Sequence, residues 1–132
     1  MKSLSFEVLR AANTERLPLF KNCHGEPAHA QPDGSDWSNA EWLQAVVGEL
    51  GEYANFAKKF QRGDINAVEF GEHARKELAD VVTYCDLLAF RLGINLGDAI
   101  REKFNQVSNR VGVSVYISDA NEVVRDSFLV RE

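Results

Sequence analysis

Cysteine is scarce in this sequence, and no long apolar segment occurs in it. The two cysteines, Cys23 and Cys85, do not form a C-x-x-C motif, so free thiols in a reducing compartment are expected. No apolar run approaches the roughly 20 residues of a membrane span. Residues 1–7 lack the apolar core of a signal peptide. We therefore expect a soluble, cytoplasmic protein that does not contact a membrane.

An excess of basic residues is also missing, as are the familiar motifs of covalent catalysis and phosphate binding. The chain has 20 acidic and 15 basic residues and a formal net charge of −5, which argues against a protein that binds a nucleic-acid polymer through a broad basic surface. It has no P-loop, no G-x-G-x-x-G and no visible Ser-His-Asp or Cys-His constellation. A small anionic substrate would need a metal ion or local cations, which leaves clustered carboxylates to provide the chemistry.

Such carboxylates occur in two pairs. The segment from Glu41 to Leu92 has the apolar spacing of two long helices joined by a short turn at 62–66, and each helix carries two acids three residues apart, on one face. If the helices fold back antiparallel about the turn, the first acid of one pair lies level with the second acid of the other. The level pairs are Glu49 with Asp80 and Glu52 with Glu77.

Four carboxylates at one height in a partly buried seam repel one another, so they must be protonated or bridged by cations. Ligand sets made only of oxygen suit a hard divalent ion, and Mg²⁺ or Mn²⁺ are the first candidates. A single E-x-x-E is about as typical of a solvated helix face as of a metal ligand. Two pairs placed symmetrically about a turn favour the metal site.

Two short strings around these acids match the signature of a known family. They are Gly48-Glu49-Leu50-Gly51-Glu52, followed by Asn55 and Lys58-Lys59, and Lys76-Glu77-Leu78-Ala79-Asp80. Together they resemble the MazG-like all-α nucleoside triphosphate pyrophosphohydrolases, whose signature is E-E-x-x-E, a spacer and E-x-x-D. Gly48 stands where the family has its first Glu. The resemblance implies an all-α antiparallel helical bundle that is completed by oligomerisation, as a homodimer or homotetramer. The alternation Val113-Ser114-Val115-Tyr116-Ile117 predicts that a short extended C-terminal segment follows the bundle.

The resemblance also implies a domain organisation and a reaction. A single MazG-like domain would span residues 1–132, with its core at 38–112, an N-terminal helix and loop at 1–37 and a C-terminal tail at 113–132. The reaction is Mg²⁺-dependent hydrolysis of a (deoxy)nucleoside triphosphate to the monophosphate and pyrophosphate, in housekeeping of the nucleotide pool, and Mn²⁺ could replace Mg²⁺.

Roles for individual residues follow from the same resemblance. Glu49 and Glu52 would be catalytic, and both would bind metal together with Glu77 and Asp80. The substrate would be bound by Asn55, Lys59, Lys103, Arg110 and Trp37. Two simpler interpretations stay open, because Lys103 and Arg110 could lie at the rim of the core and Trp37 could be a packing residue.

Outside the acid pairs, helices are predicted over 5–20 and 96–111, a loop over 21–36 and an extended segment from 113. Arg10, Asn13 and Arg16 fall at helical intervals of three, and we expect them on a solvated face, although relatives often line their pocket with polar residues in this segment. Asp86, six residues after Asp80, is expected at the surface. The apolar face over 66–92 is so broad that a second subunit is expected to cover part of it.

Two other classes of function are consistent with the sequence. One is a different enzyme on the same scaffold, a dimeric dUTPase or a phosphoribosyl-ATP pyrophosphohydrolase, which a substrate panel would distinguish. The other is a non-catalytic metal-binding helical interaction module, in which the acids hold a structural ion or a basic partner. That module would melt in a metal-dependent way without turning over a substrate.

Overall fold

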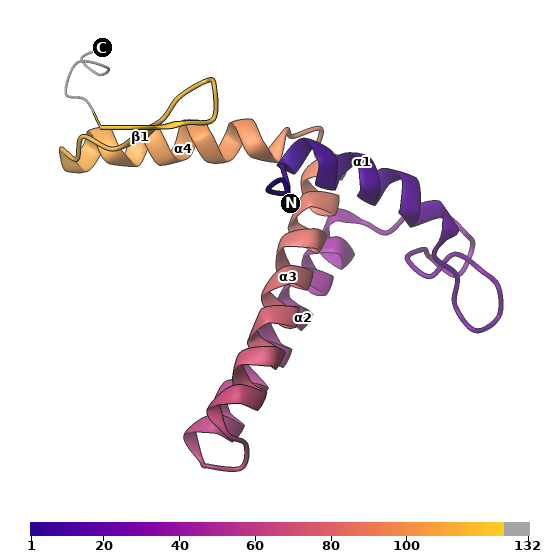
Figure 1. The fold of residues 1–132 in the computed structure, drawn as a ribbon. Helices are drawn as coiled ribbons and strands as arrows, with labels where there is room; N and C mark the ends of the chain where they lie inside the picture. The colour runs from indigo at the N-terminus through magenta and orange to yellow at the C-terminus, as the bar shows by residue number, and fades with distance from the viewer. Residues whose placement is uncertain (126–132) are drawn as a thin grey trace. The chain divides into compact units, whose positions relative to one another are not determined.

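The computed structural model describes residues 1–125 and is mainly helical, with one small two-stranded sheet, which agrees with the predicted all-α class (Figure 1). The chain divides into two compact units, Met1–Gly93 and Ile94–Glu132. The single domain over 1–132 stays a prediction. The elements are α1 (Phe6–Arg16), the 3-10 helix η1 (Leu17–Leu19), α2 (Asn39–Gln61), α3 (Ala67–Arg91), α4 (Leu96–Val111), β1 (Tyr116–Ile117) and β2 (Val123–Val124).

The helices α2 and α3 form the predicted antiparallel hairpin (Figure 1). Each begins with a capping box, in which a polar side chain and a glutamate satisfy exposed backbone N–H groups of the first turn. Ser38 and Glu41 cap α2, and Asn66 and Glu69 cap α3. Between the helices Gly63 adopts a φ of 79°, a left-handed conformation that favours glycine. These local signals fix the ends of both helices.

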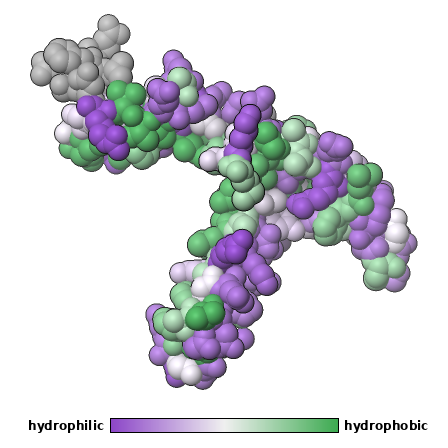
Figure 2. Space-filling view, viewed as in Figure 1, coloured by the Kyte–Doolittle hydropathy of each residue, from purple (hydrophilic) through white to green (hydrophobic). Residues whose placement is uncertain are grey.

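The hairpin buries only part of its apolar faces. Leu43, Val47 and Leu50 share one face of α2 and are 51%, 58% and 50% exposed, and Leu78 and Val82 on α3 are 49% and 44% exposed. Figure 2 shows apolar side chains scattered among polar ones on the visible surface. Two helices share a single seam, so within the first unit these faces are left without a partner. The predicted covering by a second subunit stays a prediction.

Helix α1 packs on α3 through polar groups, which corrects two expectations. Asp86 was expected at the surface, but only 1% of it is exposed, because its side chain lies on the side of α3 that α1 covers. Arg10 Nε donates to one carboxylate oxygen of Asp86 and Asn13 Nδ2 to the other, each at 3.0 Å. Asn13, expected on a solvated face, is buried with it. The buried charge is tolerated because both oxygens have donors.

The second unit joins α4 to the β1–β2 hairpin. Asn95 caps α4, and Gly112, with a φ of 71°, ends it. Tyr116 pairs with Val124 in the antiparallel ladder, so the predicted extended segment forms a short strand. The side chain of Asn105 donates to the carbonyl of Ile117 and accepts from its N–H, which ties the strand to α4. The rest of the predicted tail, from residue 126, lies outside the described residues.

Among residues 1–125, no helix combines the length and the apolar character that a membrane span requires.

Candidate functional site

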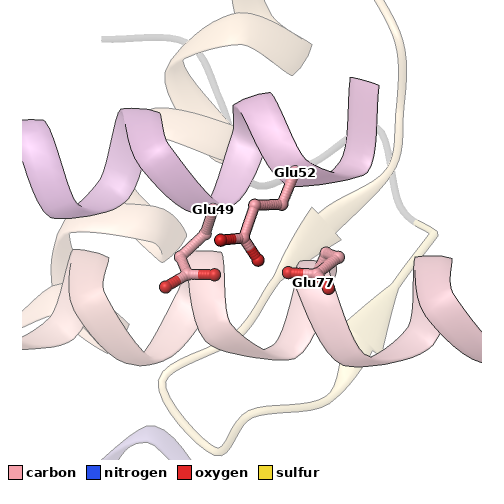
Figure 3. Close-up of side chains that lie close together, drawn as sticks. All are labelled: Glu49, Glu52 and Glu77. Atoms are coloured by element: carbon pink, nitrogen blue, oxygen red, sulfur yellow. The ribbon is translucent and has the colours of Figure 1, made fainter. Parts of the chain in front are cut away.

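Three glutamate side chains converge between the two helices of the hairpin. Glu49 and Glu52 project from α2 and Glu77 from α3, and each brings one carboxylate oxygen to within 4.8 Å of the others (Figure 3). The i, i+3 spacing places the first two on one face of α2, and the antiparallel hairpin brings Glu77 level with them. Glu77 is 8% exposed, Glu49 is half-buried and Glu52 is exposed. The predicted convergence of acids is therefore found for these three, which we call the glutamate cluster.

The glutamate cluster disfavours its own full ionisation. Burial raises the pKa of Glu49, and the charges of Glu52, Asp80 and Glu77 raise it further. A hydrogen bond with Glu77, followed by the charge of Glu77, raises the pKa of Glu52. A hydrogen bond between two carboxyl groups requires a proton on one of them. A divalent cation could replace this proton and offset two of the three negative charges.

Asp80 is not part of the glutamate cluster, but it lines a pocket beside it together with Glu49. The pocket has a volume of about 260 Å³ and lies within the first unit. Its other walls come from α1, η1, the loop after η1 and α3. The lining residues besides the two acids are Asn13, Arg16, Leu17, Phe20, His29, Thr83, Tyr84 and Leu87.

Aromatic rings surround His29 at this pocket. The His29 ring stacks on the fully buried Trp42, with 5.7 Å between centroids and 10° between planes, and meets the edges of Phe20 and Trp37. Its Nε2 lies 3.1 Å from the hydroxyl of Tyr84. The loop that carries His29 is thus held against α2 and α3 by ring packing.

Two titratable groups of the pocket are kept neutral. Burial, and then the charge of Arg16, lowers the pKa of His29. Burial raises the pKa of Tyr84, and the charges of Glu49 and Asp80 add to this effect. The pocket therefore combines a neutral imidazole and a protonated phenol with two carboxylates and the guanidinium of Arg16.

The structure places the predicted substrate-binding residues of the first unit as follows. Asn55 and Lys59 are exposed on α2, three and seven residues after Glu52, and the Lys59 ammonium lies 5.1 Å from the centre of the Phe56 ring. Trp37 does not line the pocket but contacts His29, which does. The packing interpretation of Trp37 therefore describes its present contacts.

Lys103 and Arg110 lie on α4, in the second unit. Lys103 Nζ donates to Oε1 of Gln106 at 2.8 Å, and Arg110 is in the last turn of the helix. Their predicted contact with substrate phosphates stays a prediction.

Sequence reasoning missed Tyr84 and His29 as pocket residues, and it assigned Asn13 and Arg16 to a solvated face. Tyr84 follows Asp80 by four residues, so helical spacing could have placed it on the same face. Arg16 was expected on a solvated face, and it is exposed, but it also lines the pocket. His29 lies in a loop with no periodic pattern, and no sequence signal connects it to α3.

No protein-family model, curated protein or solved structure matches the chain. The chemistry must therefore follow from the site itself. Carboxylates alone make a donor set for Mg²⁺ or Mn²⁺, and the neighbouring pocket could receive the organic part of a ligand bound to such an ion.

Proposed function

We propose that the protein is a MazG-like pyrophosphohydrolase, which hydrolyses a nucleoside triphosphate to the monophosphate and pyrophosphate with Mg²⁺, or Mn²⁺ in its place. The observation that carries this proposal is the glutamate cluster, in which three carboxylate oxygens from two helices lie within 4.8 Å of one another. Asp80 would join the metal ligands from the adjacent pocket wall. Repulsion within the cluster is relieved when a divalent ion binds, so the donor set fits the ion.

A bound Mg²⁺ would neutralise phosphate charge and lower the pKa of a water molecule. Glu49 is our candidate for the general base, because it belongs to the cluster and also lines the pocket. The water oxygen forms a bond to the α-phosphorus, the bond from that phosphorus to the bridging oxygen breaks, and the water proton passes to Glu49. The bridging oxygen and its electron pair leave with pyrophosphate.

The pocket beside the cluster would hold the nucleobase. Phe20 and Tyr84 offer aromatic surface, and neutral His29 offers a donor or an acceptor without a charge. Arg16 supplies a cation that could contact phosphate or a base carbonyl. In this arrangement Trp37 acts on the base indirectly, by packing on His29.

We also propose that the working form is a homodimer or homotetramer. The exposed apolar residues Leu43, Val47 and Leu50 on α2 and Leu78 and Val82 on α3 support this assembly. Light scattering coupled to size-exclusion chromatography would measure the mass in solution, and a monomer at micromolar concentration would contradict it.

Product analysis tests the reaction. The protein is incubated with standard and modified (d)NTPs, including dUTP, and with phosphoribosyl-ATP, in Mg²⁺, in Mn²⁺ and in EDTA, and the products are separated by ion-exchange chromatography. The proposal expects monophosphate and pyrophosphate in equal amounts, with either metal and not in EDTA. Release of diphosphate and phosphate would show cleavage of a different bond. No turnover of any substrate by folded, metal-binding protein would favour the non-catalytic module.

A further inference from the structure

Asp86 is a buried carboxylate that the proposed chemistry does not use. Its two oxygens accept from Arg10 Nε and Asn13 Nδ2, and its backbone carbonyl lies 3.4 Å from a second nitrogen of Arg10. Burying an ion pair costs desolvation energy that its attraction often fails to offset, and apolar residues of similar volume commonly stabilise a fold equally well. Stability alone therefore does not explain why a charge stands here. The charge instead holds two side chains of α1 at defined positions on α3.

Arg10 and Asn13 determine the position of one wall of the pocket. Asn13 lines the pocket itself, and its Nδ2 also donates to the carbonyl of Thr83, another lining residue, at 3.2 Å. Arg16 follows Asn13 by three residues, as Asn13 follows Arg10, so the three share one face of α1. Once Arg10 and Asn13 are held, the rotation and register of α1 determine where Arg16 lies. Within the first unit, α1 packs on α3 and not on α2, so α3 is the helix of this unit that sets this register.

We propose that Asp86 is a positioning residue: by binding Arg10 and Asn13 it fixes α1 on α3, and thereby sets the shape of the pocket and its affinity for substrate. This inference rests on the proposed function. Asp86 belongs to neither the glutamate cluster nor the pocket lining, so its effect on substrate must pass through α1. Removing its charge should weaken substrate binding and spare both the metal ligands and the chemical step.

The test compares Asp86→Asn with the double variant Arg10→Met, Asp86→Leu. The single change keeps the shape of the side chain and removes the charge, and we expect KM to rise about tenfold or more, with kcat within about twofold. The apolar double variant should recover thermal stability, because no uncompensated charge remains. It still lacks the carboxylate acceptor of Asn13 and leaves only the Thr83 carbonyl, so its KM should stay raised. A merely structural role would instead restore KM together with stability.

Asp64→Asn is the matched control. It breaks the ion pair between Asp64 and Arg62, 2.9 Å long, in the turn between α2 and α3, and should leave KM unchanged. Binding of Mn²⁺, followed by electron paramagnetic resonance, should be the same in wild type and all variants.

Each outcome bears on one claim. An unchanged KM in folded Asp86→Asn, or recovery of the wild-type KM by the double variant, would overturn the positioning role and leave the proposed function standing. If Asp86→Asn does not fold, the double variant decides by its KM alone. If the wild-type protein neither binds nor hydrolyses any triphosphate, both the proposed function and the positioning role of Asp86 are wrong.

Discussion

Glu77→Gln is the substitution that best distinguishes a metal site from a group of surface acids that binds no metal. Gln has the shape of Glu without the charge, so it removes one anion of the glutamate cluster and leaves the packing of a residue that is 8% exposed. Without metal the substitution should stabilise the protein, because repulsion is relieved. With Mg²⁺ it should destabilise the protein relative to wild type, because a ligand is lost. Such a change of sign is not expected for an ordinary surface acid.

The magnitude follows from the separation of the oxygens, which is at most 4.8 Å. Two full charges at that distance repel by about 1 kcal/mol in water and by about 3.5 kcal/mol at an effective permittivity of about 20. Since the cluster borders solvent, the lower value applies, and the melting temperature of metal-free Glu77→Gln should rise by about 3 °C at pH 8. At a Mg²⁺ concentration about 100 times its Kd, the wild type should gain about 2.7 kcal/mol, or about 8 °C.

Differential scanning calorimetry with Mg²⁺ and with EDTA measures both effects. Glu72→Gln is the control, since Glu72 is exposed on the same helix outside the glutamate cluster. It should match wild type in both conditions. A lower melting temperature for metal-free Glu77→Gln, combined with a Mg²⁺ response as large as that of wild type, would refute the assignment of Glu77 as a ligand.

Three further predictions follow from other contacts. Because the pKa values of Glu49 and Glu52 are raised, the folded state holds extra protons between the ordinary and the raised pKa, and the free energy of unfolding of the metal-free protein falls as the pH rises through that window. Thermal melts should therefore show a larger Mg²⁺ stabilisation at pH 8 than at pH 5, and an equal gain at both would contradict the cluster as the binding site. Tyr84→Phe removes the hydroxyl that lies 3.1 Å from His29 Nε2, and steady-state kinetics should show KM raised about fivefold, in line with about 1 kcal/mol for a hydrogen bond; an unchanged KM would exclude this contact from substrate binding. Ser38→Ala removes the cap of α2 and should cost about 1 kcal/mol in chemical denaturation, with kcat unchanged; unaltered stability would show that the cap contributes nothing.

The hairpin and its acids could be predicted because their signals are local. Ser38 and Glu41 mark the start of α2, the turn around Gly63 joins two long periodic segments, and a short turn leaves little freedom in the pairing of the helices. Residue numbers alone then bring Glu52 level with Glu77, as the structure shows. Helical spacing and a short connection are sufficient for this part of the site.

The environment of Asp86 could not be predicted in this way. Periodicity shows which residues share a face of α3, but not which neighbour covers that face. The donors of Asp86 stand 73 and 76 positions away in the sequence, on a short helix whose docking the sequence does not specify. The contact between His29 and Tyr84 spans 55 positions and involves a loop residue, so the sequence did not predict it either.

For the apolar faces too, periodicity identifies the face but not the element that covers it. The spacing of Leu43, Val47 and Leu50 identifies a stripe on α2, yet half of each side chain or more is exposed. A pattern of apolar residues records that a surface favours burial. It does not identify the partner, and the first unit, residues 1–93, does not supply one.

The most direct test of the central claim is the rate of pyrophosphate release from the best triphosphate substrate, measured for wild type, Glu49→Ala and Asp80→Ala, with Mg²⁺ and with EDTA. We expect release by the wild type with Mg²⁺ only, and loss of release in both variants while their circular dichroism stays helical. Release that persists in EDTA, or in both folded variants, would contradict a metal-dependent reaction at these carboxylates.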